Sequence, residues 1–150
     1  MFDFIFKRSK AIANNSKKVK QWQAEHKALA THAVRTVELC EAKQFKKAKK
    51  QLVKLQSVAL KHLMDEDITF MELFHKAENN AVDQSILHAI NDFRRSFTDT
   101  KKVLVHFFIH YTDPKADLDH EFLEKLKGII EALVARIEFE EQNLYVMINK

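Results

Sequence analysis

Glycine and proline are almost absent from this sequence, which has one of each in 150 residues, Gly128 and Pro114. Tight turns, strand bends and phosphate-binding loops depend on glycine, and proline interrupts helices. A chain with so few of these residues favours helices throughout. No glycine-rich dinucleotide fingerprint or P-loop is present. The composition therefore predicts an all-α fold and argues against nucleotide-binding enzymes of those two kinds.

Cysteine and long apolar segments are also scarce. The single Cys40 excludes a disulfide within the chain and suits a reducing compartment. No segment approaches the ~20 consecutive apolar residues of a membrane-spanning helix. The N-terminal MFDFIFKRSK places its basic residues after a short apolar stretch, the reverse of a secretory signal. We therefore expect a cytoplasmic protein without stable membrane insertion, in which the bundle end packs against Phe2, Phe4, Ile5 and Phe6.

Basic residues are abundant: 25 lysines and arginines outnumber 21 acidic residues, giving a net charge of +4 and a pI of about 9.1. The lysines concentrate in SKKVK (16–20) and KQFKKAKKQLVK (43–54). Such runs can bind nucleic acid, but arginines are few here and apolar residues recur between the lysines at helical spacing. We interpret the runs as solvated helix faces and expect no nucleic-acid partner.

Three interruptions divide the chain into four helical segments: around Glu41–Gln44, at Asn79-Asn80 and over Thr112–Leu118. Asp113-Pro114 is the firmest stop, because the residue before proline disfavours helix and proline lacks a backbone donor. Between the interruptions, apolar residues recur every three or four positions, the period of an amphipathic helix. Short connections make successive helices antiparallel neighbours. The pattern predicts a single domain over 1–150, an up-down-up-down antiparallel four-helix bundle.

The expected core-facing positions are mostly apolar, but four of them carry groups that an apolar core excludes: His26, His62, Glu66 and Glu140. Burying such groups costs several kcal/mol unless they pair with one another or with a metal. The remaining expected core residues are Val19, Trp22, Leu29, Ala33, Thr36 and Cys40, then Phe45, Ala48, Leu52, Leu55, Ala59, Thr69 and Leu73, then Ile86, Ile90, Phe93, Phe97, Thr100, Leu104, Phe107 and Tyr111, and finally Leu126, Ile130, Leu133, Ile137 and Leu144.

The four polar positions are expected to lie at similar depth in the bundle. His62 and Glu66 are four residues apart, so they stack on one helix face. If each helix runs antiparallel to the one before it, counting residues back from each loop gives the depth of a residue in the bundle. By this count His26, Glu140 and the neighbouring Arg136 lie within ~13 Å of His62 and Glu66 along the bundle axis. Imidazole and carboxylate ligands together suit iron, manganese or zinc. The spacing therefore predicts a candidate metal site.

Three short motifs surround these residues: EHKAL with His26, HLMDED with His62 and Glu66, and RIEFEEQNLY with Glu140. In these motifs the chain resembles the hemerythrin family, specifically its HHE cation-binding type. Members of that family are four-helix bundles whose histidines and carboxylates hold a non-haem di-iron centre that binds oxygen or responds to redox state. The resemblance implies iron as the cofactor, dioxygen as a ligand, and a role in sensing, storage or iron handling.

Two positions depart from that family's pattern. Arg136 stands four residues before Glu140, where the family usually has a histidine, and arginine stays charged and cannot ligate a metal. The third helix should offer a histidine near the layer of Glu66, yet it has Phe93 and Phe97 there. Both departures reduce the ligand set below that of a complete di-iron centre.

The other histidines of the third helix are lesser candidates. Reflection places the His106 and His110 pair two to four turns away from Glu66, at ~5.4 Å per turn, and off the core-facing side. His88 lies nearer to that layer but also off the core-facing side. We interpret all three as partly exposed helix residues.

An arginine at the position of Arg136 is typical of a second family that this sequence resembles. IEALVARIEFEE, taken with VKQWQAEHKAL, is similar to the regulator of sigma D (AlgQ-like) family of bacterial anti-sigma proteins. Those proteins are also helical bundles and carry an arginine in a similar closing segment. This resemblance implies a metal-free bundle that works by binding a protein partner such as a sigma factor.

Three interpretations of the polar positions follow. In the first, they hold a metal and Arg136 hydrogen-bonds to a ligating carboxylate. In the second, Arg136 takes the place of the metal and pairs with Glu66 or Glu140. In the third, the helix faces are rotated and these groups reach water. We expect a binding protein rather than an enzyme in each case, because the sequence offers no oxyanion loop and Cys40 lacks a histidine partner.

Overall fold

The computed structural model describes residues 17–78 and 84–145. Within these ranges the chain is helical and has no β-strand, which confirms the all-α prediction for this part of the chain. The N-terminal phenylalanines, the expected break at Asn79-Asn80 and the side chain of Ile86 lie outside the described residues. The elements are α2 (Lys17–Glu41), α3 (Phe45–Glu78), α4 (Gln84–Thr112), α5 (His120–Phe139) and a π-helical turn, η1 (Glu140–Leu144).

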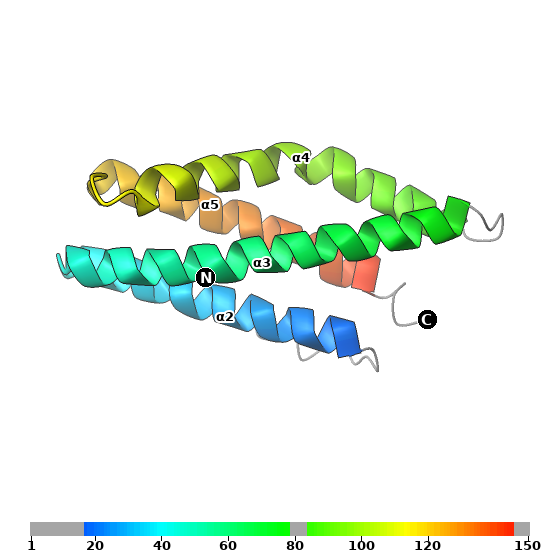
Figure 1. The fold of residues 1–150 in the computed structure, drawn as a ribbon, viewed down its shortest axis with the longest axis horizontal. Coiled ribbons are helices and arrows are strands. Elements are labelled where there is room, and N and C mark those ends of the chain that lie inside the picture. The colour runs from blue at the N-terminus through cyan, green and yellow to red at the C-terminus, as the bar shows by residue number, and fades with distance from the viewer. Residues whose placement is uncertain (1–16, 79–83, 146–150) are drawn as a thin grey trace.

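The four helices lie alongside one another along the long axis of the molecule (Figure 1). α3 packs against α2 and α4, and α5 packs against α2 and α4, so the contacts close a ring. η1 continues α5 and also contacts α4. None of the described helices is long and apolar enough to cross a membrane.

The turn between α2 and α3 forms without glycine. Lys43 adopts a φ of 59°, the left-handed conformation that glycine usually takes just after a helix. The Lys43 N–H donates to Cys40 O at 3.0 Å and the Gln44 N–H donates to Leu39 O at 2.8 Å, which satisfies two terminal carbonyls of α2. The predicted break is confirmed, and the tight turn makes α2 and α3 neighbours along their lengths.

The connection between α4 and α5 is closed by a lysine from α3. Lys49 Nζ donates to three backbone carbonyls, those of Tyr111 at 2.8 Å, Asp113 at 2.8 Å and Ala116 at 2.7 Å. A lysine charge is favourable there because the last carbonyls of α4 carry the negative end of the helix dipole. The predicted break is again confirmed, but Lys49 is not the purely solvated lysine that the sequence pattern indicated.

Two apolar clusters fill the interior, one on each side of the polar residues. The larger cluster lies toward the α2–α3 and α4–α5 connections and includes Leu52, Leu104 and Phe122. The smaller one surrounds Trp22 and Phe93. The polar layer between them therefore sits in a water-poor interior, where an unpaired charge is costly.

Most of the expected core residues are buried, with a few exceptions on α3 and α4. Phe45, the first residue of α3, is 47% exposed and lines an open pocket beside the connection between α4 and α5. After Glu66 we expected Thr69, three residues on, to face the core of the bundle. That expectation was wrong, because Phe70 is buried there and Thr69 is only half-buried. Further expected core residues are also only half-buried: Leu73, Phe97 and Thr100.

Replacing Lys49 by methionine tests the closed end of the molecule. Lys49→Met keeps most of the side-chain length but removes the charged donor from three carbonyls, so we expect a loss of roughly 1.5–3 kcal/mol in the free energy of unfolding. Urea denaturation followed by circular dichroism measures it. Lys47→Met, at an exposed position of the same helix, is the matched control and should change stability by less than about 0.5 kcal/mol. Equal effects of the two changes would contradict the role of Lys49.

Candidate metal centre

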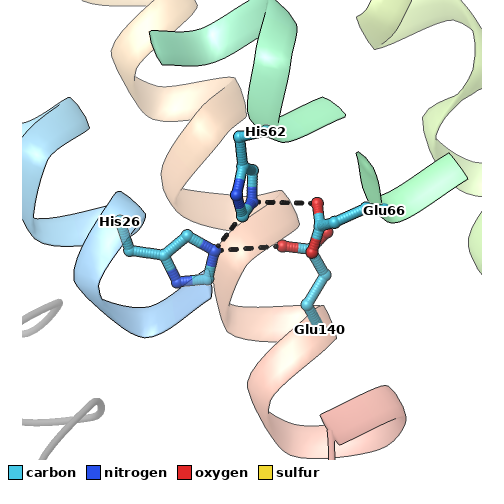
Figure 2. A group of neighbouring side chains, drawn as sticks. All are labelled: His26, His62, Glu66 and Glu140. Carbon is cyan, nitrogen blue, oxygen red and sulfur yellow. Dashed lines mark hydrogen bonds and ion pairs between the residues drawn. The ribbon is translucent and has the colours of Figure 1, made fainter. Parts of the chain in front are cut away.

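Four side chains from three parts of the chain meet in one buried cluster. His26 comes from α2, His62 and Glu66 come from successive turns of α3, and Glu140 is the first residue of η1 (Figure 2). One ligand atom of each lies within 4.8 Å of those of the other three. Each residue is at most 3% exposed, so the interpretation in which these groups reach water is wrong.

The two imidazole rings face each other through their Nε2 atoms, which are 3.1 Å apart. Their outer nitrogens are held by carboxylates: His26 Nδ1 lies 3.2 Å from Glu141 Oε1, and His62 Nδ1 lies 2.6 Å from Glu25 Oε1. An ionised carboxylate only accepts hydrogen bonds, so each Nδ1 carries the proton. In a neutral ring this leaves the Nε2 lone pair directed into the cluster, as in histidines that ligate a metal.

The two carboxylates complete the cluster from the other side. Glu66 Oε1 lies 2.9 Å from His62 Nε2 and accepts a hydrogen bond from it when His62 is protonated. Its other oxygen, Oε2, accepts a hydrogen bond from the Tyr145 hydroxyl at 2.7 Å. Glu140 Oε1 lies 3.5 Å from His26 Nε2. Nitrogen and oxygen atoms capable of donating lone pairs thus converge on one small volume.

Arg136 approaches the same carboxylates from the side of α4. Its Nε donates to Glu140 Oε2 at 3.3 Å, and its Nη2 lies 3.6 Å from Glu66 Oε1. The guanidinium carbon stands 4.6 Å from the centre of the Phe93 ring, a cation–π contact. The predicted neighbourhood of Arg136 is therefore observed, with the residue 3% exposed. Phe93 stands where the resemblance to the hemerythrin family implied a histidine, and its ring packs against the guanidinium of Arg136 instead.

The pKa values show which charges the layer keeps. Burial lowers the pKa of His62, but the charge of Glu66 and the hydrogen bond to Glu25 raise it to about 10. Burial raises the pKa of Glu66, but His62, Glu140 and Arg136 hold it at about 2. Burial and the charge of Glu66 raise the pKa of Glu140 to about 7. Without a metal, the layer therefore contains a protonated His62 beside an ionised Glu66 at neutral pH.

The π-helical turn explains how two consecutive glutamates both point inward. The Tyr145 N–H bonds to Glu140 O, one residue further back than in an α-helix. This wider turn buries Glu140, Glu141 and Tyr145 together. A regular α-helical period of 3.6 residues through this segment did not predict that Glu141 and Tyr145 are buried beside Glu140. The only sequence signal was the doubled glutamate of RIEFEEQNLY.

Residues next to the candidate ligands anchor α3 to its neighbours. Asp65 accepts hydrogen bonds from Trp22 Nε1 at 2.8 Å and from Lys18 Nζ at 2.6 Å, which ties α3 to α2. Asp67 pairs with Lys101 of α4. The two aspartates that flank Glu66 in HLMDED thus fix its depth between α2 and α4. The sequence analysis had assigned them no role.

The lesser histidine candidates do not join the cluster. The side chain of His88 is 82% exposed and pairs with Asp92 on its own helix. His106 and His110 are exposed and line a separate cavity between α4 and α5. In the described part of α4, no side chain joins the group of His, Cys, Asp and Glu donors that could hold an ion.

The donor set fits one metal ion. Two imidazole nitrogens and two carboxylates form the kind of site that binds first-row divalent metals. Ligand atoms bound to one ion at ~2.1 Å lie at most ~4.2 Å apart, so the 4.8 Å spread requires only a small inward movement. Such an ion would take the place of the proton between His62 Nε2 and Glu66 Oε1, which lie 2.9 Å apart.

Neither resemblance seen in the sequence is matched by a recognised relative. The chain matches no protein-family profile, no curated protein and no solved structure. The hemerythrin-like and regulator of sigma D-like resemblances therefore stay predictions, and the contacts described above carry the functional argument.

Proposed function

We propose that this protein is a hemerythrin-like, non-haem iron-binding protein of the cytoplasm, with His26, His62, Glu66 and Glu140 as ligands. The observation that carries the proposal is the carboxylate on each outer Nδ1, which fixes both rings with Nε2 inward. Such partners orient metal-ligating histidines and raise their basicity.

The proposed centre holds one ion rather than two. Arg136 lies beside Glu66 and Glu140 on the side that faces α4, and Phe93 covers its guanidinium. A guanidinium placed there fills the space of a second ion and neutralises the carboxylate charge that a second ion would need. When bound, iron supplies reversible redox change and an attachment point for dioxygen. The chain's own residues bind and orient the ion, and the apolar clusters on either side exclude water.

We further propose that the four helices form the up-down-up-down antiparallel bundle expected of this family. Cross-helix pairs support opposite directions for α2 and α3: Lys18 near the start of α2 pairs with Asp65, whereas His32 further along α2 pairs with Gln51 earlier in α3. Helices of opposite direction bring ligands from distant parts of the chain to one level.

The proposal predicts that His62→Ala removes bound iron. Purified wild-type protein should contain about one iron per chain and melt at a lower temperature after chelation, because metal bound to the folded form adds to its stability. Glu25→Ala, which keeps His62 but removes its Nδ1 partner, should weaken iron affinity by roughly 10–100-fold. Elemental analysis and thermal unfolding measure both effects. His106→Ala, an exposed histidine of α4, is the control and should leave iron content unchanged.

Chelation should also reverse the pH dependence of stability. In metal-free protein the pKa of His62 rises from 6.5 to about 10, so its contribution is full below 6.5 and is lost as the pH rises through about 10. Iron-loaded protein should instead lose stability as the pH falls, because protons compete with iron for the imidazoles. Denaturant titrations across the pH range measure both profiles. Identical profiles with and without iron would contradict a metal at this site.

The contacts of Arg136 favour a second candidate function. This buried guanidinium already pairs with Glu140 and lies near Glu66 and Asp67, so it can neutralise the layer without a metal. We propose as the alternative a metal-free bundle that regulates a protein partner, such as a sigma factor, in the manner of the regulator of sigma D family.

Substituting Arg136 separates the two functions. If the protein is metal-free, Arg136→Ala leaves a buried carboxylate uncompensated and should cost roughly 3–5 kcal/mol, with the same melting temperature before and after chelation. If iron is bound, Arg136→His adds an imidazole beside Glu140 and should strengthen iron binding. Arg95→Ala, at an exposed arginine, controls for loss of charge. Iron-free, chelator-insensitive protein from iron-replete cells would refute the iron proposal, and stoichiometric iron would refute the alternative.

A further inference from the structure

Tyr145 is a buried phenol whose hydroxyl reaches the candidate ligands. Its oxygen lies 2.7 Å from Glu66 Oε2, 3.1 Å from His26 Nε2 and 3.5 Å from Glu140 Oε1. These three atoms belong to three of the four proposed ligands. The hydroxyl therefore lies in the same small volume on which the imidazole and carboxylate donors converge, and no part of the residue is exposed.

The ring of Tyr145 is held rigidly in this position. It stacks on the imidazole of His26, with ring centres 5.8 Å apart and planes inclined by 14°, and it packs against Trp22 at 5.3 Å. The π-helical turn directs it inward together with Glu140 and Glu141. The hydroxyl donates a hydrogen bond to Glu66 Oε2, so a phenylalanine would fill the same apolar space but leave that buried oxygen without its donor.

We propose that Tyr145 is a fifth ligand of this centre and binds iron(III) through its phenolate oxygen; this inference rests on the iron-binding function proposed above. On binding, the phenol O–H bond breaks and the oxygen donates a lone pair to iron(III). The displaced proton would be released to solvent, as happens when a protonated ligand binds a metal ion, and Glu66 would stay ionised. No oxidation state changes in this step.

The charges of the five donors favour the ferric ion. Two carboxylates and one phenolate bring three negative charges, and two neutral imidazoles bring none, so the five donors alone balance iron(III). Around them, the two carboxylates Glu25 and Glu141 outnumber the single guanidinium of Arg136. A buried site favours such a balance, because an uncompensated charge in a water-poor interior is costly. Phenolate and carboxylate oxygens are also hard donors, which suit a hard ion. The negative charge of the Tyr145 phenolate thus favours iron in its oxidised state at this centre.

Spectroscopy of the ferric protein tests the inference. Full-length protein loaded with iron(III) in air should show a visible phenolate-to-iron charge-transfer band, and resonance Raman excitation in that band should reveal phenolate ring modes. Tyr145→Phe should retain most of the iron but lose the band. The chain has only one other tyrosine, Tyr111, which lies in the larger apolar cluster. Tyr111→Phe is therefore the matched control and should keep both the iron and the band.

Each outcome decides the question. Iron-containing wild type without the band, or a band that persists in Tyr145→Phe, would overturn phenolate ligation and leave the four-ligand iron site standing. Wild type that binds no iron(III) would overturn the iron site and the phenolate together. If Tyr145→Phe fails to fold or to bind iron, the Raman modes of the wild type and their survival in Tyr111→Phe still assign the ligand to Tyr145.

Discussion

The need to neutralise charge inside a dry interior governs this structure. Two imidazoles and two glutamates lie between apolar clusters that offer no water, so each must find a partner of fixed geometry. Because these groups come from α2, α3 and η1, the helices must keep one relative depth. Asp65 and Asp67 hold α3 at that depth through Trp22, Lys18 and Lys101. The polar layer thus fixes the depth at which each helix lies relative to its neighbours.

An ion and the arginine would share one oxygen of this layer, because Glu66 Oε1 lies 2.9 Å from His62 Nε2 and 3.6 Å from Arg136 Nη2. The imidazole Nε2 atoms and the inner carboxylate oxygens face one another, while Arg136 takes the remaining oxygen of Glu140 on the opposite side. In the proposed iron-bound protein, the ion would take the inner oxygen of Glu140 while Arg136 keeps the outer one. Arg136 would then compensate part of the carboxylate charge and occupy the neighbouring space.

Helical periodicity was enough to predict the four-helix content and the shared depth of His26, His62 and Glu66. It could not predict Glu141 or Tyr145, because the π-helical turn that brings them inward depends on packing against other helices rather than on local sequence. Glu25 was also missed: it lies beside His26 in sequence, but it serves His62 on the neighbouring helix. Similarly, Lys49 looked like one of many surface lysines, since its three acceptors lie more than sixty residues away.

The Lys49 contacts stabilise the end of the molecule that holds the connection between α4 and α5. His62 stands thirteen residues further along α3, ~20 Å away at the rise of an α-helix, in the polar layer between the two apolar clusters. Partial opening on that side can proceed while the larger cluster and the closed connection stay intact, as in proteins whose segments exchange their amide hydrogens at different rates. Local opening of this kind would give the buried cluster an entrance without a permanent channel and without global unfolding.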